Sequence, residues 1–303
     1  IEVSAGFVPV RTKDFTWSFS LNWSANHNKL VKLQDGWDSS EPLQASMGTT
    51  IGSRTYVYSY VGQEMYYIYG RGYQRAPEGS YYLDSNGNKV DCSGMKIINS
   101  KSGMPSLDSS PTRRIAKVNP DWRAGMTQSF RYKNLTLSAN FSAQMGGHTF
   151  SVTNFSLSYQ GKLKNSLAGR DNGLTVEGVN AVTAADGTVT YTKNTTPVSS
   201  IVTYYNKYVW VRDNTEENTF STDFLKCREI RLDYSVPRRL LNKVKFLQNA
   251  HVGAWVTNVF TISRFPQYDP ETGMLNGTNI YNGIETMAYP MTRSYGMNVI
   301  LAF

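Results

Sequence analysis

Apolar and polar residues alternate along several segments of the chain, with the period of two that is typical of β-strands. In residues 15–25 the aromatic and aliphatic side chains fall on one face, and Ser, Thr and Asn fall on the other. Residues 135–143 and 122–132 repeat this pattern, and Gln128 is the one polar residue on the apolar side of the second. The alternation therefore predicts an all-β protein.

The length and the polar face of these runs favour a membrane-spanning barrel over a soluble sandwich. Each run has about ten residues, the length that crosses a bilayer when the strand is tilted, whereas strands of soluble proteins usually have about five or six. The polar faces carry mostly Ser, Thr, Asn and Gly rather than charges, which suits a water-filled lumen. We therefore expect part of a large transmembrane antiparallel β-barrel.

Short and long connections separate the expected strands. We expect about nine strands, near residues 1–10, 14–27, 54–61, 65–73, 122–132, 135–145, 219–236, 246–261 and 292–303. Short turns are expected at 11–14, 62–64, 133–134 and 237–245, and long loops at roughly 28–53, 74–121, 146–218 and 262–292. This asymmetry is typical of outer-membrane barrels, so a periplasmic C-terminus would place the long loops outside the cell.

The odd number of expected strands implies additional chain. A bacterial single-chain barrel normally has an even number of strands, and an open sheet in lipid would leave unpaired backbone groups at its edges. Ile1 begins directly in an alternating segment. We therefore expect further residues upstream of Ile1, and we take residues 1–303 as one domain, the C-terminal portion of a barrel.

The composition adds candidate contact residues and excludes some functions. The chain has 20 Tyr, 13 Phe and 6 Trp, and its net charge of +8 comes from scattered basic residues without a Lys/Arg-rich tract, which argues against nucleic-acid binding. Aromatic residues in the long loops either contact a substrate or a lid protein, or only fold their own loops. The candidates are Tyr81, Tyr82, Trp210, Tyr268 and Tyr281.

Charged residues gather on one face of the strand at 224–236. Cys227, Glu229, Arg231, Asp233 and Ser235 are expected to face inward, opposite an apolar outer face. Opposite charges two residues apart can pair with a neighbouring strand or contact a plug domain. An ion-pair ladder in the lumen is favoured over direct contact with a substrate.

No arrangement of residues indicates catalysis, a metal or a cofactor. The three His (His27, His148 and His251) are far apart, and no nucleophile–base pair or pair of carboxylates stands out. Residues 84–88 are similar to the start of a calcium loop but lack the terminal Glu, so we expect a turn there. Cys92 and Cys227 either pair or stay free. We predict that the protein is not an enzyme and has no cofactor.

Several segments, in order along the chain, resemble the C-terminal half of SusC/RagA-type TonB-dependent transporters. They are Pro9-Val-Arg-Thr-Lys-Asp-Phe-Thr-Trp17, Val61-Gly-Gln-Glu64, Asn119-Pro-Asp-Trp-Arg-Ala-Gly125, Phe130-Arg-Tyr-Lys-Asn134, Gln144-Met-Gly-Gly147, Leu225-Lys-Cys-Arg-Glu-Ile-Arg-Leu-Asp-Tyr-Ser-Val-Pro237, Thr257-Asn-Val-Phe-Thr261 and Tyr268-Asp-Pro-Glu-Thr-Gly273. The last strand also matches the terminal signal used for outer-membrane assembly, in Tyr295, Met297, Val299, Leu301 and Phe303.

The resemblance implies a 22-stranded barrel in the bacterial outer membrane, crossing the lipid many times and closed by an N-terminal plug. It also implies a SusD-type surface lipoprotein as a lid, a dimer of such transporter–lipoprotein pairs, and import of oligosaccharides or peptides powered by the TonB complex through the plug. The plug and the TonB-contacting segment are absent from these residues, so the chain is not expected to transport alone.

Two other functions stay open. A siderophore or vitamin receptor of the same class would differ in ligand size and would lack the lipoprotein lid. A soluble β-rich adhesin or carbohydrate-binding module would close its sheet within these residues and would leave the cell envelope without detergent.

Overall fold

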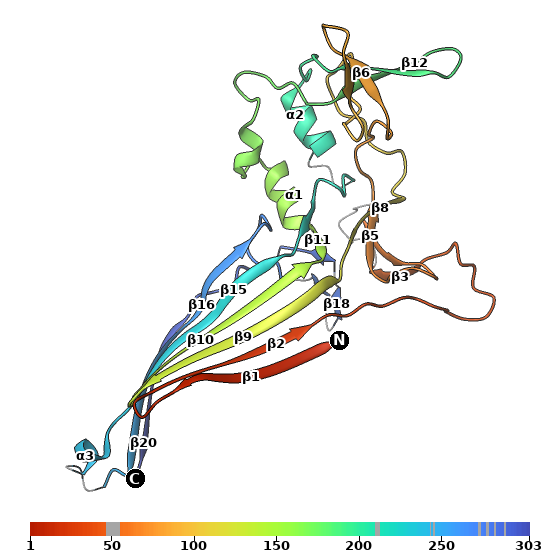
Figure 1. Cartoon of the computed structure of the whole chain (residues 1–303). Coiled ribbons are helices and arrows are strands. Elements are labelled where there is room, and N and C mark those ends of the chain that lie inside the picture. The colour runs from red at the N-terminus through yellow and green to blue at the C-terminus, as the bar shows by residue number, and fades with distance from the viewer. Residues whose placement is uncertain are drawn as a thin grey trace.

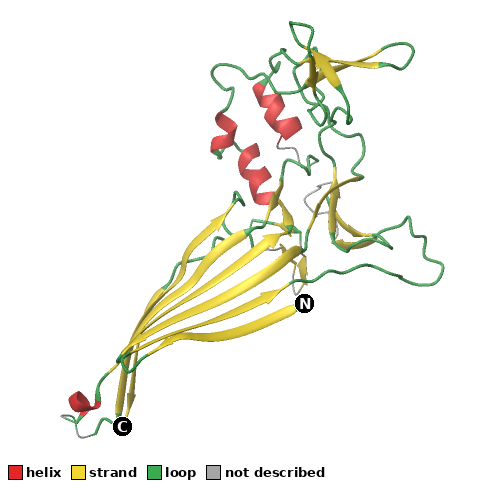
Figure 2. Cartoon of the chain, in the orientation of Figure 1, coloured by secondary structure: helices red, strands yellow, loops and turns green. Residues whose placement is uncertain are grey.

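A long, twisted antiparallel sheet carries an assembly of loops, short sheets and helices at one end (Figure 1). This computed structural model describes residues 1–46, 55–209, 213–242, 244, 246–271, 274–276, 279–281, 283–287 and 289–303. No helix in these ranges is long and apolar enough to cross a membrane. Figure 2 shows that the helices gather in the loop assembly, except for a short one near the C-terminus.

Seven strands of the described residues form the long sheet, which we call the wall. In spatial order they are β1 (Glu2–Arg11), β2 (Phe15–Ser24), β9 (Pro120–Tyr132), β10 (Leu135–Gly146), β15 (Phe224–Ser235), β16 (Asn249–Ser263) and β20 (Tyr295–Ala302). Each neighbouring pair is antiparallel. Among the described residues β1 and β20 lie at opposite edges and do not pair with each other, so the sheet is not closed.

The strand registers separate an apolar face from a polar one. One row across six strands consists of Trp17, Phe130, Leu137, Leu232, Ala254 and Met297. These side chains do not fill a protein core, since Leu137 is 41% exposed and Met297 is 77% exposed. The adjacent row begins with Ser18, Ser129 and Ser138 and faces the other way. The predicted division between apolar and polar faces is therefore present in the wall.

Gln128 lies on the apolar face, as its position in the sequence predicted. The indole Nε1 of Trp17 donates a hydrogen bond to Gln128 Oε1 at 2.8 Å, across the β2–β9 pair. This bond compensates a polar side chain among apolar neighbours, where an unpaired amide would be costly.

Two of the nine expected strands do not belong to the wall. Residues 54–61 and 65–73 contain β4 (Tyr56–Ser59) and β5 (Tyr67–Gly70), which pair with β3 (Leu43–Ser46) and β8 (Arg113–Lys117) in a separate sheet. Their inward residues, such as Val57 and Ile68, pack against Phe150 and Val152 in a buried cluster. The alternation was real, but strands this short pack against protein and cannot cross a bilayer.

The connections are short at one end of the wall and long at the other, as predicted. Residues 12–14, 133–134 and 236–248 connect strands at the C-terminal end, and the last contains α3 (Arg238–Leu241). Residues 25–119, 147–223 and 264–294 form the loop assembly (Figure 1). The expected turn at 62–64 therefore lies within the first long loop. Residues 47–54, part of the loop expected at 28–53, are outside the described ranges.

The loop assembly contains three further sheets and several helices. Its sheets are β14 (Thr219–Ser221), β11 (His148–Ser151) and β19 (Ile284–Glu285); β12 (Val179–Thr183), β13 (Val189–Lys193), β6 (Tyr81–Leu83) and β7 (Lys89–Asp91); and β17 (Met274–Asn276) with β18 (Asn279–Tyr281). Its helices are α1 (Val152–Tyr159), η1 (Lys164–Leu167), α2 (Ile201–Tyr204) and η2 (Tyr205–Val209).

A bulge in β15 changes which face Cys227 occupies. Phe141 pairs with Cys227 while its neighbour in β10 pairs with Glu229, so Arg228 is an extra residue in the ladder. An extra residue shifts the alternation by one position. The expectation that Cys227 faces the same way as Glu229 is therefore wrong: Cys227 lies between Phe141 and Phe260 and is 1% exposed.

Candidate functional site

The polar face of the wall holds a compact ion pair at the level of β15. Arg231 donates to both carboxylate oxygens of Asp233 at 2.7 and 2.9 Å, and also to Asn298 Oδ1 of β20 at 2.9 Å. Gly253 of β16 lies beneath these groups, where the three side chains leave no room for a Cβ. Glu229 lies on the same face, opposite Asn140. The polar face of the wall therefore carries charged side chains. Contact of Glu229, Arg231 and Asp233 with a plug domain stays a prediction.

Beyond the bulge, the charges of β15 hold a loop instead. The buried Lys226 ammonium contacts both oxygens of Asp269 at 2.6 and 2.7 Å and Glu271 Oε2 at 2.5 Å. Arg228 contacts Glu271 at 2.6 Å and donates to Ser142 Oγ at 2.6 Å. We call these five residues the rim network.

The electrostatics of the rim network are balanced, with two cations facing two carboxylates. Burial by itself would raise the pKa of Glu271, but hydrogen bonds from Arg228 and Lys226 outweigh it and hold that pKa below its ordinary value. A buried charge without such partners would cost several kcal/mol. The network therefore fixes the start of the 264–294 loop to the wall.

A second buried carboxylate attaches the same loop to α1. Glu285 is 1% exposed and accepts a hydrogen bond from Ser151 Oγ at 2.6 Å, another from the hydroxyl of Thr153, and one from Thr153 N at 3.4 Å. These donors lie at the N-terminus of α1, where the helix dipole favours a negative charge. The 264–294 loop is thus anchored at two separated points.

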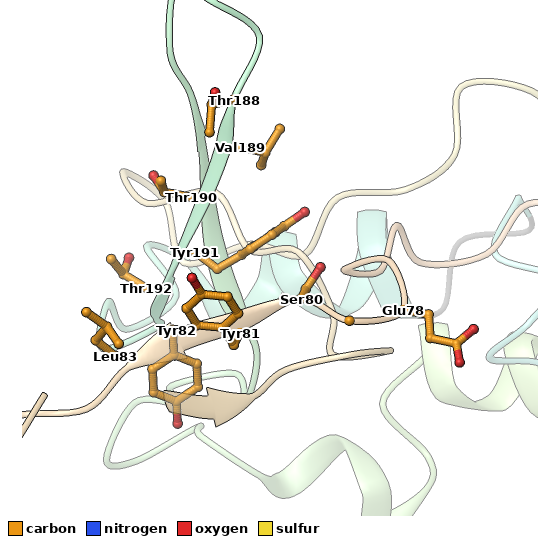
Figure 3. A pocket seen from close by; sticks show the side chains of 11 residues that line it. Glu78, Ser80, Tyr81, Tyr82, Leu83, Thr188, Val189, Thr190, Tyr191 and Thr192 are labelled. Carbon is orange, nitrogen blue, oxygen red and sulfur yellow. The ribbon is translucent and has the colours of Figure 1, made fainter. Parts of the chain in front are cut away.

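The sheet formed by β12, β13, β6 and β7 lies farthest from the wall (Figure 1). Side chains of this sheet line an open cleft (Figure 3). We call this sheet the distal sheet. Its two hairpins pair at a single described position, Tyr82 with Tyr191, and in parallel orientation. The cleft between them has a volume of about 570 Å³. Its lining consists of Glu78, Gly79, Ser80, Tyr81, Tyr82, Leu83, Thr188, Val189, Thr190, Tyr191 and Thr192.

A partly buried cluster of polar side chains around Tyr73 joins two of the long loops. Tyr73 N donates to Glu216 Oε2 at 2.9 Å, and Arg75 pairs with the same carboxylate. The Lys96 ammonium lies 3.7 Å from the centre of the Tyr73 ring and 4.0 Å from Glu217. Tyr73 is 1% exposed, and burial raises the pKa of its phenol well above the ordinary value.

The structure brings only some of the predicted contact residues together. Tyr81 and Tyr82 lie side by side in β6 at the cleft. Tyr268 is exposed and adjoins Asp269 of the rim network, whereas Tyr81 and Tyr82 belong to the distal sheet. Trp210 lies outside the described residues, and for Tyr281 only the backbone, in β18, is described. Contact of these aromatic residues with substrate or lid stays a prediction.

The sequence did not reveal the rim network or the second half of the cleft. Residues 146–218 are expected to be one long loop, yet they contain the hairpin of β12 and β13. The signal for the rim network was present as two basic residues flanking Cys227 and two acidic residues in the Tyr268–Gly273 motif. Nothing in the spacing showed that these two segments meet.

Neither metal ligands nor a disulfide can be assigned within the described ranges. No group of three or more His, Cys, Asp and Glu side chains there could hold a metal ion. Cys92 and Cys227 are both free and buried.

Long antiparallel strands with one apolar and one polar face, short turns at one end and long loops at the other define the wall of an outer-membrane type of β-barrel. No protein-family model matches the sequence. The chain is 26% identical to TonB-dependent receptor P3 of Formosa agariphila over 97% of its own length and 27% of the relative. It is also 26% identical to TonB-dependent receptor SusC of Bacteroides thetaiotaomicron over 100% of its own length and 26% of the relative.

A solved structure has the same fold. The RagAB peptide importer in its closed-closed state superimposes with a TM-score of 0.63 at 18% identity, over 100% of this chain and 29% of that one. The chain is therefore similar over nearly its whole length to TonB-dependent receptors of the SusC type and shares the fold of RagAB, which confirms the resemblance in its sequence motifs. It spans about a quarter of the length of the curated relatives that it matches.

Proposed function

We propose that the chain is the C-terminal portion of the barrel of an outer-membrane importer that takes up nutrients with energy from TonB. The observation that carries this proposal is the continuous apolar row from Trp17 to Met297, exposed on a sheet whose other face is polar. In a soluble protein such a row would face water. In a barrel it faces hydrocarbon, and the polar face lines the lumen.

The edges of the wall support additional barrel strands. Among the described residues, the outer edges of β1 and β20 have no strand partner. An unpaired backbone group costs roughly 2–7 kcal/mol in an apolar medium. Further strands of the same transporter would satisfy them, and a plug inside the closed barrel would contact the polar face near Glu229, Arg231 and Asp233. TonB would act through that plug.

With the short turns on the periplasmic side, residues 25–119, 147–223 and 264–294 would lie outside the cell. A SusD-like lipoprotein would lie on this loop assembly as a lid, in a dimer of transporter–lipoprotein pairs. The substrate would be an oligosaccharide or a peptide, and the transporter would act by binding and translocation without catalysis. The alternative function is a siderophore or vitamin receptor. Purification of the complete transporter without a lipoprotein would favour this alternative.

A matched pair of substitutions in the complete transporter tests the placement of the faces. Leu137→Arg puts a charge on the apolar row and is expected to cost about 2–4 kcal/mol if it reaches the middle of the bilayer. Asn140→Arg puts the same charge on the polar face of the same strand, opposite Glu229. We expect the first variant to reduce the amount of folded barrel in outer-membrane fractions several-fold, and the second to leave it unchanged. Equal effects of the two would refute the assignment of faces.

Partner and energy dependence are tested separately from barrel placement. Affinity purification of the complete transporter in detergent should recover a surface lipoprotein, and uptake of its nutrient should stop in cells that lack TonB. Recovery of the protein in buffer without detergent, or uptake that continues without TonB, would contradict the proposal.

A further inference from the structure

We infer that the cleft of the distal sheet binds a neutral saccharide. This inference rests on the proposed function, because it assigns a substrate class to one site on the loop assembly of the importer. It goes beyond that function in naming the site and the groups that recognise the ligand.

The cleft is a built feature of the distal sheet. Because the hairpins pair at one described position, Tyr82 with Tyr191, the strands diverge on either side of it and leave a gap (Figure 3). Below the gap both tyrosines pack against a buried cluster of Ala76, Cys92 and Val179. The cleft therefore has a fixed base, and its volume of about 570 Å³ falls within the range of roughly 300–1,000 Å³ of small-molecule sites.

The lining is rich in hydroxyl groups and poor in charge. Ser80, Thr188, Thr190 and Thr192 contribute hydroxyls from both hairpins, and the single ionisable acid or base among the lining residues, apart from the tyrosine phenols, is Glu78. Hydroxyls both donate and accept hydrogen bonds, which matches the hydroxyl groups of a sugar. For the charges of a peptide the cleft offers Glu78 in its lining and Lys89 beside the Tyr81 ring, which is fewer partners than the lining hydroxyls offer to a sugar.

Tyr81 supplies an aromatic platform at the side of the cleft. It is 46% exposed, and the Lys89 ammonium lies 4.2 Å from its ring centre. An exposed ring stacks on the C–H face of a pyranose, while its phenol reaches the sugar hydroxyls. Tyr82 faces the buried cluster instead, so the two adjacent tyrosines have different roles: Tyr81 contacts ligand and Tyr82 fixes the strand.

Calorimetric titration of the purified complete transporter tests the site. The probes are neutral oligosaccharides of α-glucan, xylan and galactan type, with an uncharged heptapeptide for comparison. Tyr81→Ala removes the ring, Tyr81→Phe keeps the ring and loses the hydroxyl, and Tyr289→Ala serves as a control because Tyr289 is 94% exposed in another loop. Circular dichroism before and after heating shows that each variant is folded.

The expected result is that at least one saccharide binds and that Tyr81→Ala weakens its binding about tenfold. Tyr81→Phe should stay within about threefold of the unchanged protein, and Tyr289→Ala should match it. The inference is overturned if no saccharide binds, if Tyr81→Ala binds saccharide normally, or if Tyr81→Ala weakens peptide rather than saccharide binding. TonB-dependent uptake that persists in any of these cases would leave the proposed function standing.

Discussion

Removing the Lys226 ammonium should release the 264–294 loop from the wall. Lys226 is 2% exposed and contacts both Asp269 and Glu271, while Arg228 would still hold Glu271. Taking away one partner of a buried ion pair typically costs about 3–5 kcal/mol, because the remaining charge stays in a poorly solvated place. Much of that cost is avoided if the loop detaches and its carboxylates reach water.

Hydrogen exchange measures this detachment directly. In Lys226→Met, backbone amides around residues 265–271 should exchange roughly 100- to 1,000-fold faster than in the unchanged transporter, since a tenfold change corresponds to about 1.4 kcal/mol. Amides of β9 and β10 should be unaffected. Lys164→Met is the matched control, because Lys164 is exposed in η1 and has no ion pair among those described.

A double variant separates the ion pair from a general loss of packing. If Lys226 and Asp269 are coupled, Lys226→Met with Asp269→Asn should be less destabilised than the sum of the two single variants. Exchange in Lys226→Met within twofold of the unchanged protein, or strict additivity in the double variant, would refute the role given to the rim network.

Three further predictions concern other groups. The pKa of Glu271 is lowered in the fold, so its stabilising contribution is complete above the ordinary value of 4.5 and is lost as pH falls through the lowered value. The protection factors of the loop amides, which correct for the intrinsic pH dependence of exchange, should be constant from pH 7 to 5 and fall below about pH 4.5, and a fall already at pH 6 would contradict this. Gly253→Val should disturb the Arg231–Asp233 pair and cost about 1–3 kcal/mol in urea unfolding of the barrel in vesicles, whereas an unchanged midpoint would show that the pair tolerates the added side chain. Trp17→Phe and Gln128→Leu should each destabilise by about 1 kcal/mol, but the double variant should cost less than their sum, because it leaves neither polar group unpaired; strictly additive losses would exclude the hydrogen bond as the cause.

The wall could be predicted from the sequence because its alternation persists over whole strands. Residues 15–25 and 135–143 keep apolar and polar positions separate for a full membrane crossing, and no competing structure uses that pattern over that length. The short strands β4 and β5 show the same alternation for four residues each. Alternation alone does not tell whether an apolar face meets lipid or a protein core, so these strands were wrongly placed in the wall.

The loop contacts could not be predicted because they join segments that are far apart in the chain. Lys226 and Asp269 meet across 43 residues, and Tyr82 and Tyr191 across more than a hundred. Local patterns carry no information about such meetings. The phenols, hydroxyls and carboxylates of the loops were visible as residue types, but the distal cleft depends on which two hairpins pair.

The positions of the charged residues in β15 indicate the bulge at Arg228, because they change from even to odd numbers within one strand. Charged residues of this strand first occupy even positions, at Lys226 and Arg228. They then occupy odd positions, at Glu229, Arg231 and Asp233. A strand without a bulge cannot place both sets on one face. A change of parity within a continuous strand therefore indicates an extra residue.

This bulge divides β15 into two parts with different roles. On the side toward the short turns, Arg231 and Asp233 pair with each other and with Asn298, so their contacts stay within the wall. On the other side, Lys226 and Arg228 direct their charges to the 264–294 loop. The extra residue turns both sets of charges to the polar face despite their opposite parity. Substitutions of Lys226 or Arg228 should therefore change where the loop sits, while substitutions of Arg231 or Asp233 should change what the polar face of the wall presents.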